Sequence, residues 1–169
     1  IEDLTVVPSV HGNDAELSYE VRTCGSGEVS LTVTDEDGIE VAQASGASGQ
    51  ITIRNVRLWQ PGNAYLYTVC VRFGTDCYTL PVGVRTVELR GNQFLINSRP
   101  FYFKGYGKHE DSYFRGRGLD EALNVKDLAL MKWQGANSFR TSHYPYSEEM
   151  LRLCDREGIV VLDEAPAVG

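Results

Sequence analysis

Hydrogen-bonding side chains crowd into one short stretch of the sequence, NSFRTSHYPYSEE, at residues 137–149. Two further polar stretches, GYGKHEDSYFRGRG at 105–118 and DEAPAVG at 163–169, also follow strand-like apolar runs. Side chains of Asp, Glu, Asn and His hydrogen-bond to sugar hydroxyls, and aromatic rings can stack on the apolar face of a sugar. The three stretches therefore favour carbohydrate chemistry. The candidate contacts are Asp111, His143, Tyr144 and Tyr106.

Each candidate also has a purely structural interpretation. Asp111 could be an exposed loop carboxylate, and His143 could be a histidine whose hydrogen bonds are satisfied within the fold. Arg140, inside an expected strand, could pair with Asp163 or Glu164 beneath the site, and either carboxylate could instead contact substrate. The supporting candidates are His109, Arg140, Tyr144, Asp163 and Glu164.

Other chemistries fit these stretches less well. Several potential metal ligands follow the expected strands, but the sequence has no HxH after the first of them and no HExxH, so we expect no metal site. Ser142 lies directly beside His143 without a GxSxG elbow, which argues against a serine nucleophile. The glycines at 105–118 do not form GxGxxG, and the neighbouring acids would repel phosphate. We expect no cofactor.

The polar stretch at 105–118 must be positioned by the elements around it. A hairpin with its turn near Asn97–Ser98 is expected to run into an apolar strand at Phe101–Phe103. Asp120 is a suitable N-cap for the helix EALNVKDLALMKWQ, and Gly135 is a suitable residue to end it. We expect this helix to pack through one broad apolar face. That face comprises Ala122, Val125, Leu128, Ala129 and Trp133.

The polar stretches at 137–149 and 163–169 follow expected strands in the same way. A short strand is expected at 137–141, a helix between the N-cap Ser147 and Gly158, and a buried apolar strand at 159–162. The order strand–helix–strand–helix–strand indicates the βαβαβ portion of a parallel α/β fold, either barrel or doubly wound. In such folds functional residues gather at the carboxyl ends of the strands, where all three polar stretches lie.

Residues 1–86 have a different pattern. Short runs rich in β-branched and aromatic residues alternate apolar with polar positions, and turn sequences such as DEDG and QPGN separate them. About seven strands without a helix indicate an all-β immunoglobulin-like sandwich, although the Cys–Trp–Cys spacing of antibody domains is absent. We therefore expect a sandwich at 1–86 and an α/β part at 87–169.

Bulk composition limits the partners and the compartment. The 169 residues carry a net charge of −7, whereas nucleic acid binding requires a basic stripe, so we expect no nucleic acid partner. No apolar run approaches the roughly 20 residues that span a bilayer, and no signal peptide is visible, so we expect a soluble protein with no membrane partner. Cys70 and Cys77 flank a hairpin turn and could face each other, although free thiols are favoured over a bridge.

The stretch 137–162, NSFRTSHYPYSEEMLRLCDREGIVVL, resembles the first signature of glycoside hydrolase family 2. The matching elements are Asn137, Arg140, His143, Tyr144, Pro145, Met150, Leu151, Asp155 and Gly158. FLINSRPFYFKGYGKHED is similar to the stretch by which family members enter their barrel, and LWQPGNAYLYTV to the last strands of their immunoglobulin-like domain. Within the family, HED followed by RGRGLD, and DEAPAVG, look more like β-glucuronidases than β-galactosidases or β-mannosidases. Ser112–Tyr113 departs from the glucuronidase pattern but leaves Asp111 in place.

The resemblance implies an enzyme with a jelly-roll domain, an immunoglobulin-like sandwich and a (β/α)8 TIM barrel. This chain would then hold the sandwich and the first βαβαβ portion of the barrel. The family's acid/base and nucleophile glutamates lie on later strands, so the resemblance implies no catalytic residue here and a piece that is inactive alone. It also implies that Asp111 and His143 bind hydroxyls of a β-glucuronide substrate.

Three barrel strands would leave an open sheet edge and uncovered apolar surface. We therefore expect the remaining parts of the same polypeptide, or self-association into a homo-oligomer, to cover them. Two alternatives remain at this point. One is β-galactosidase or β-mannosidase specificity within the same family, and the other is a non-catalytic carbohydrate-binding or scaffold piece.

Overall fold

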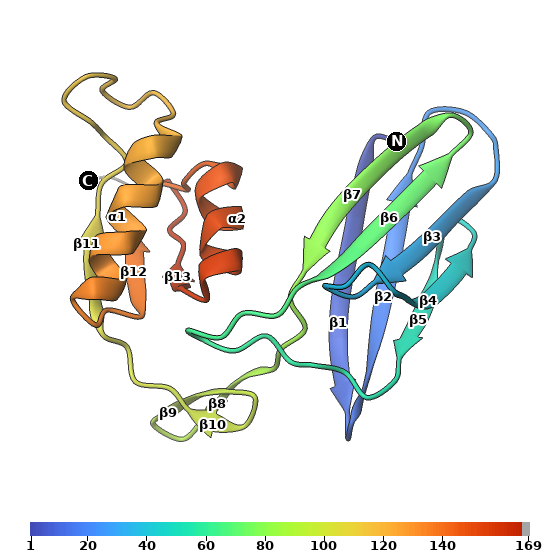
Figure 1. Ribbon diagram of the computed structural model, residues 1–169, viewed down its shortest axis with the longest axis horizontal. Coiled ribbons are helices and arrows are strands. Elements are labelled where there is room, and N and C mark those ends of the chain that lie inside the picture. Colours follow the sequence, from blue (N-terminus) through green and yellow to red (C-terminus); the bar gives the residue numbers. More distant parts are fainter. Residues whose placement is uncertain (167–169) are drawn as a thin grey trace. The chain divides into compact units, whose positions relative to one another are not determined.

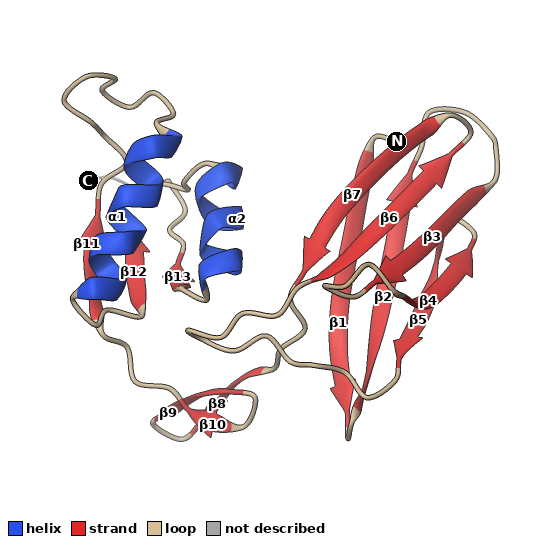
Figure 2. Ribbon diagram, in the orientation of Figure 1, coloured by secondary structure: helices blue, strands red, loops and turns tan. Residues whose placement is uncertain are grey.

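The computed structural model describes residues 1–166, so the last three residues of the DEAPAVG stretch lie outside the described part. The chain divides into two compact units. The first comprises Ile1–Trp59 and Tyr65–Pro100, and the second comprises Gln60–Ala64 and the chain from Phe101 onward. Figures 1 and 2 show strands alone in the first unit and both helices in the second.

Seven strands of the first unit form two antiparallel sheets. One sheet has the order β1-β2-β5 and consists of β1 (Asp3–His11), β2 (Asp14–Arg22) and β5 (Ser48–Ile53). The other has the order β4-β3-β6-β7 and consists of β3 (Val29–Thr34), β4 (Glu40–Ser45), β6 (Tyr67–Phe73) and β7 (Asp76–Val82). Each of these sheets pairs its neighbouring strands in antiparallel register.

The two sheets share one apolar core. Val29, Leu31 and Val33 of β3 are buried while the residues between them are more exposed, which is the period-two pattern that the sequence predicts. Buried side chains of the other sheet, including Leu17 and Ile53, belong to the same cluster. The predicted β-sandwich is therefore confirmed, because two sheets bury their inner faces against each other.

A small antiparallel sheet follows the sandwich within the first unit. It has the order β10-β9-β8 and consists of β8 (Val87–Arg90), β9 (Gln93–Ile96) and β10 (Arg99–Pro100). Asn97 and Ser98 connect β9 to β10 with φ angles of 51° and 59°, so the predicted turn position is confirmed. The Asn97 side chain accepts a hydrogen bond from the Thr86 amide at 3.0 Å and donates one to the Trp59 carbonyl at 2.9 Å.

The second unit alternates strands with helices. Its elements are β11 (Gly105–Lys108), α1 (Glu121–Trp133), β12 (Ser138–Thr141), α2 (Glu148–Glu157) and β13 (Val160–Leu162). The three strands form a parallel sheet in the order β11-β12-β13. The described residues form no closed barrel.

The strand expected at Phe101–Phe103 lies further along the chain, at Gly105–Lys108, so that prediction is wrong. The backbone at 102–104 lies outside the strand register and is bound by the Asn137 side chain and by the backbone amides of Asn137 and Ser138. Asn137 donates to the Tyr102 carbonyl at 2.9 Å and accepts from the Lys104 amide at 2.8 Å. Pairing with β12 begins only at Gly105, where a Cβ atom would overlap the Ser138 carbonyl. The close approach of the two backbones therefore requires glycine at this position.

The predicted helix ends are confirmed by their caps. Asp120 accepts a hydrogen bond from the Leu123 amide at 3.1 Å, and Ser147 accepts one from the Met150 amide at 3.3 Å. Gly158 ends α2 in the left-handed conformation, with φ of 69°. These caps satisfy backbone groups that have no partner within the helix.

The predicted apolar face of α1 is wrong for all but one member. Leu128 is buried, but Val125 and Trp133 are 56% and 82% exposed. The helix instead buries Asn124, Leu128 and Met131, a narrower stripe at the spacing of successive turns. This stripe packs on the second core cluster, whose other members are Phe139, Tyr146, Met150, Cys154 and Ile159.

The cysteines are free thiols in different environments. Cys70 and Cys77 face each other across the β6–β7 hairpin, with their sulfur atoms 3.3 Å apart. Cys154 lies in the core of the second unit and is 2% exposed. Burial raises the pKa of its thiol to about 12. Its folded pKa thus lies well above the value of about 8.5 for an unfolded cysteine.

We predict that Cys154 makes stability fall at alkaline pH. Between about pH 8.5 and 12 the unfolded chain loses the thiol proton that the folded chain keeps, so the free energy of unfolding decreases as pH rises. Urea unfolding at several alkaline pH values should show a shallower decrease for Cys154→Ala than for the wild type. Cys24→Ala, at an exposed position, is the matched control and should keep the wild-type slope. Equal slopes for wild type and Cys154→Ala would contradict the prediction.

Candidate active site

The three polar stretches meet at one edge of the second unit. Parallel strands β11, β12 and β13 all end there, and Lys108 at the end of β11 lies opposite Thr141 at the end of β12. Arg140 in turn lies opposite Leu162 at the end of β13. The segments that begin at 109, 142 and 163 therefore leave the sheet side by side, as the sequence predicts for the carboxyl ends of parallel strands.

A histidine pair lies between the first two segments. The rings of His109 and His143 pack edge to face with centroids 5.4 Å apart. His143 Nδ1 lies 3.7 Å from Glu164 Oε2 on the third segment. His143 is about half exposed, so the opposite side of its ring remains accessible to a ligand.

Glu164 also lies beside an arginine at this edge. Its Oε1 atom lies 3.3 Å from Arg140 Nε, so the expected pairing of Arg140 with one of these carboxylates is present. The Arg140 side chain is 48% exposed, however, and does not lie buried beneath the site. An ion pair this exposed contributes at most about 1 kcal/mol of stability, so its effect is chiefly to orient the two side chains.

Thr141 joins β12 to the segment that follows β13. Its buried hydroxyl donates to Asp163 Oδ1 at 3.0 Å and accepts from the Glu164 amide at 2.8 Å. One hydroxyl thus holds both Asp163 and Glu164. Sequence reasoning missed this residue, and the available signal was a hydroxyl at the last position of a strand beside the polar segment.

Glu110 attaches the first segment to the start of α2. Its Oε1 atom accepts hydrogen bonds from the Ser147 hydroxyl at 2.9 Å and the Ser147 amide at 3.3 Å. Its own amide donates to the Tyr144 hydroxyl at 3.4 Å. A carboxylate at a helix N-terminus is also favoured by the helix dipole. Sequence reasoning missed Glu110 as a positioning residue. The available signal was the predicted helix start at Ser147, where a nearby carboxylate can accept hydrogen bonds.

Asp111 follows directly and is exposed. Its charge acts on Tyr146, a residue of the core of the second unit. Burial raises the pKa of the Tyr146 hydroxyl, and the charges of Glu110 and Asp111 add to this effect after that of Tyr144. The protonated Tyr146 hydroxyl donates to the Lys108 carbonyl at the end of β11. Tyr146 therefore supports the site from within the core.

Two tyrosines considered as sugar contacts have different surroundings. The Arg117 guanidinium lies 4.3 Å from the ring centroid of Tyr144, so that ring already has a stacking partner at the site. Tyr106 shares a strand face with Lys108, whose ammonium pairs with Asp127 of α1 at 3.0 Å. Burial and the charge of Asp127 raise the pKa of Tyr106. Tyr106 therefore faces α1 and does not join the cluster.

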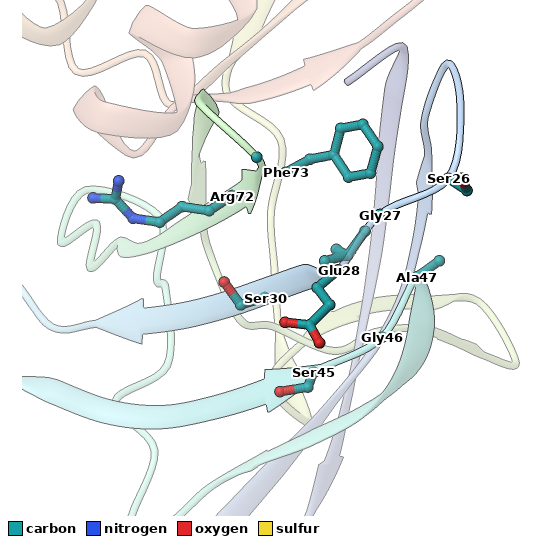
Figure 3. Close-up of a pocket in the computed structure, with 11 residues that line it drawn as sticks. Ser26, Gly27, Glu28, Ser30, Ser45, Gly46, Ala47, Arg72 and Phe73 are labelled. Atoms are coloured by element: carbon teal, nitrogen blue, oxygen red, sulfur yellow. The ribbon is translucent and has the colours of Figure 1, made fainter.

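A pocket of about 890 Å³ lies in the first unit (Figure 3). Its walls are formed by turns and strand ends, with Glu28, Ser30, Ser45, Arg72 and Phe73 among the lining residues. Figure 3 shows the Glu28 carboxylate near Ser30 and Ser45, while the Arg72 guanidinium points elsewhere. Only one carboxylate lines this pocket, so it lacks the paired carboxyl groups of acid–base chemistry.

Among residues 1–166, no three His, Cys, Asp or Glu side chains are arranged to hold a metal ion. In the same part of the chain, neither helix combines the length and apolar character required to cross a bilayer.

Two family models match the chain. The model for glycosyl hydrolases family 2 matches residues 1–85, and the model for the TIM barrel domain of the same family matches residues 87–169. The chain belongs to glycosyl hydrolase family 2. It therefore consists of the family's N-terminal sandwich domain and the start of its TIM-barrel domain.

Family members with high identity are named beta-glucuronidases. A protein of that name from Paenibacillus borealis is 54% identical over all of this chain, which covers 30% of the relative. A solved beta-glucuronidase from an uncultured Clostridium sp. has 53% identity and a TM-score of 0.96, with 99% of this chain and 30% of that chain covered. The Ruminococcus gnavus beta-glucuronidase in complex with D-glucuronic acid has 42% identity and a TM-score of 0.94, with 99% and 30% covered. The chain thus spans about a third of the length of these relatives.

We predict that Glu110 stabilises the start of α2. Glu110→Ala should lower the free energy of unfolding of this chain by about 1–2 kcal/mol, because Ser147 loses the acceptor for two hydrogen bonds. Glu110→Gln keeps an acceptor oxygen and should lose less. Urea titration followed by circular dichroism measures both variants. Wild-type stability in Glu110→Ala would contradict the assigned contact.

Proposed function

We propose that this chain is part of a retaining β-glycosidase that hydrolyses β-D-glucuronides. The observation that carries the proposal is the 54% identity, over the whole chain, to a protein named beta-glucuronidase. The cluster at the carboxyl ends of β11, β12 and β13 supports it, because TIM-barrel enzymes place their active sites at that face.

The proposed reaction is a double displacement by two glutamates that lie outside this chain. One protonates the leaving oxygen while the other, roughly 5–5.5 Å away, attacks the anomeric carbon. In this proposal residues 1–86 are an immunoglobulin-like sandwich, and residues 87–169 are the first βαβαβ portion of a (β/α)8 barrel. The remaining polypeptide completes the barrel and supplies both catalytic carboxylates. A homo-oligomer is the proposed assembly, with no nucleic acid, membrane or cofactor required.

Asp111 and His143 are the proposed contacts to the sugar hydroxyls. Asp111 presents an exposed carboxylate that can accept hydrogen bonds from hydroxyl groups, and Glu110 holds the adjacent backbone. His143 has Glu164 on the side of Nδ1, so its Nε2 atom is the one available to a hydroxyl. Together these contacts would orient the sugar for attack.

The supporting residues position these two contacts. Arg140 and His143 both contact Glu164, while His109 packs edge to face on His143. Tyr144 accepts a hydrogen bond from the Glu110 amide beside Asp111. Asp163 is held by Thr141 near the end of β12 and has a structural role in this proposal.

The first test compares the full-length polypeptide with residues 1–169. The full-length protein should release the chromophore from an aryl β-D-glucuronide faster than from the matching β-galactoside and β-mannoside. Residues 1–169 alone should release none above background, because both catalytic glutamates are missing. Turnover by residues 1–169 would place a catalytic residue in this chain and contradict the proposal.

The second test addresses Asp111 in the full-length enzyme. Asp111→Asn should lower kcat/KM for an aryl β-D-glucuronide roughly 10- to 150-fold, which corresponds to losing a charge-assisted hydrogen bond of about 1.5–3 kcal/mol. Asp37→Asn, in an exposed turn of the first unit, is the matched control and should retain wild-type kcat/KM. Wild-type kinetics in Asp111→Asn would remove Asp111 from the site.

A further inference from the structure

Lys108, the last residue of β11, carries a buried positive charge next to the proposed sugar-binding segment. Its side chain is 7% exposed, and its Nζ atom lies 3.0 Å from Asp127 Oδ2 on α1. The same Nζ atom donates a hydrogen bond to the His109 carbonyl at 3.0 Å. A buried ammonium group is unfavourable unless it is paired and hydrogen-bonded. These two contacts therefore hold Lys108 in place, although no step of the proposed reaction involves it.

The peptide group between His109 and Glu110 is held at both of its polar atoms. Its carbonyl oxygen accepts from Lys108 Nζ, and its N–H group donates to the Tyr144 hydroxyl at 3.4 Å. Rotation of this peptide plane would break both hydrogen bonds and leave polar backbone groups without partners. Its orientation sets the direction in which the chain continues to Asp111, the next residue.

The backbone on either side of this peptide group is anchored as well. The Lys108 carbonyl accepts from the Tyr146 hydroxyl, and the Glu110 carboxylate accepts from the Ser147 hydroxyl. Both of these donors directly precede α2. The Lys108 side chain adds the connection to the other helix, because Asp127 belongs to α1. The chain that leads into the proposed sugar contact is therefore held from the side of both helices.

We propose that Lys108 is a positioning residue for the sugar-binding carboxylate of Asp111. The proposal rests on the proposed glycosidase function. Lys108 acts through the His109 carbonyl, because donation from its ammonium group fixes the peptide group from which Asp111 continues. A misplacement of about 1 Å by a change outside the reacting groups can lower the rate of an enzyme roughly 100-fold. Asp127 neutralises the buried charge of Lys108.

A purely structural ion pair between Lys108 and Asp127 is the alternative, and it has different consequences. A buried pair that contributes only to stability can be replaced by apolar side chains of similar volume with little loss of stability, or with a gain. Such a replacement retains packing between β11 and α1, but it leaves the His109 carbonyl without the Lys108 donor. Stability and activity measured together therefore separate the two roles.

The experiment measures both quantities in the full-length enzyme. Lys108→Met/Asp127→Leu should keep an unfolding midpoint near that of the wild type but lower kcat/KM for an aryl β-D-glucuronide roughly 10- to 100-fold. Lys108→Arg keeps the charge and N–H donors, so it should lose less activity. Lys132→Met/Glu157→Leu is the matched control. It removes an ion pair of 2.6 Å between the last turns of α1 and α2, and it should retain wild-type kcat/KM.

A double-mutant cycle shows whether Lys108 acts through Asp111. In the Asp111→Asn enzyme the sugar contact is already weakened, so adding Lys108→Met/Asp127→Leu should lower kcat/KM by less than about threefold. Changes at independent sites have additive effects on the free energy of activation. A full 10- to 100-fold loss in the Asp111→Asn enzyme would therefore show that Lys108 acts elsewhere, and it would overturn the proposal.

Other results would also overturn it. Wild-type kcat/KM in Lys108→Met/Asp127→Leu, or failure of this variant to fold, would assign the ion pair to stability alone. An equal loss in Lys108→Arg and in the apolar replacement would show that donation to His109 is not the property that matters. If the wild-type full-length enzyme cleaves no β-D-glucuronide, the proposed function itself is rejected. An active wild type with any of the preceding results rejects only the role of Lys108.

Discussion

The parallel pairing of β11 with β12 is the constraint on which the candidate site depends. It requires glycine at 105, because any side chain there would overlap the carbonyl of Ser138. This pairing sets Lys108 opposite Thr141, so the segments that follow both strands start at the same level. Without it, His109 and His143 would not pack together, and the residues proposed to bind sugar would belong to unrelated loops.

The acidic residues at this edge all carry carboxyl groups, but they have different hydrogen-bond and ion-pair partners. Glu110 is committed to the helix start at Ser147, and Asp163 is bound by the Thr141 hydroxyl. Glu164 lies between Arg140 and His143. Asp111 presents an exposed carboxylate on the same segment as Glu110, so it is the acid best placed to meet a ligand. The proposed role of each acid thus depends on whether its carboxylate already has a partner within the fold.

Most of the secondary structure could be predicted from local signals. The caps at Asp120, Ser147 and Gly158 act on their own backbone neighbours, so their effect is visible in the sequence. The prediction of a strand at Phe101–Phe103 was wrong because apolar content alone does not determine where two backbones can approach each other. The prediction of the packed face of α1 was wrong for a related reason. Trp133 and Val125 fit an amphipathic pattern but do not face the core formed by this chain.

The family resemblance, the sandwich and the polar stretches after the expected strands could be predicted from sequence alone, because these depend on residue type and spacing along the chain. Which side chains come into contact could be seen only in the folded chain. Thr141 with Asp163, Glu110 with Ser147, and Lys108 with Asp127 join residues 19 to 37 positions apart. Such contacts depend on strand register and on which face of a strand a side chain occupies, and neither is encoded in a local pattern.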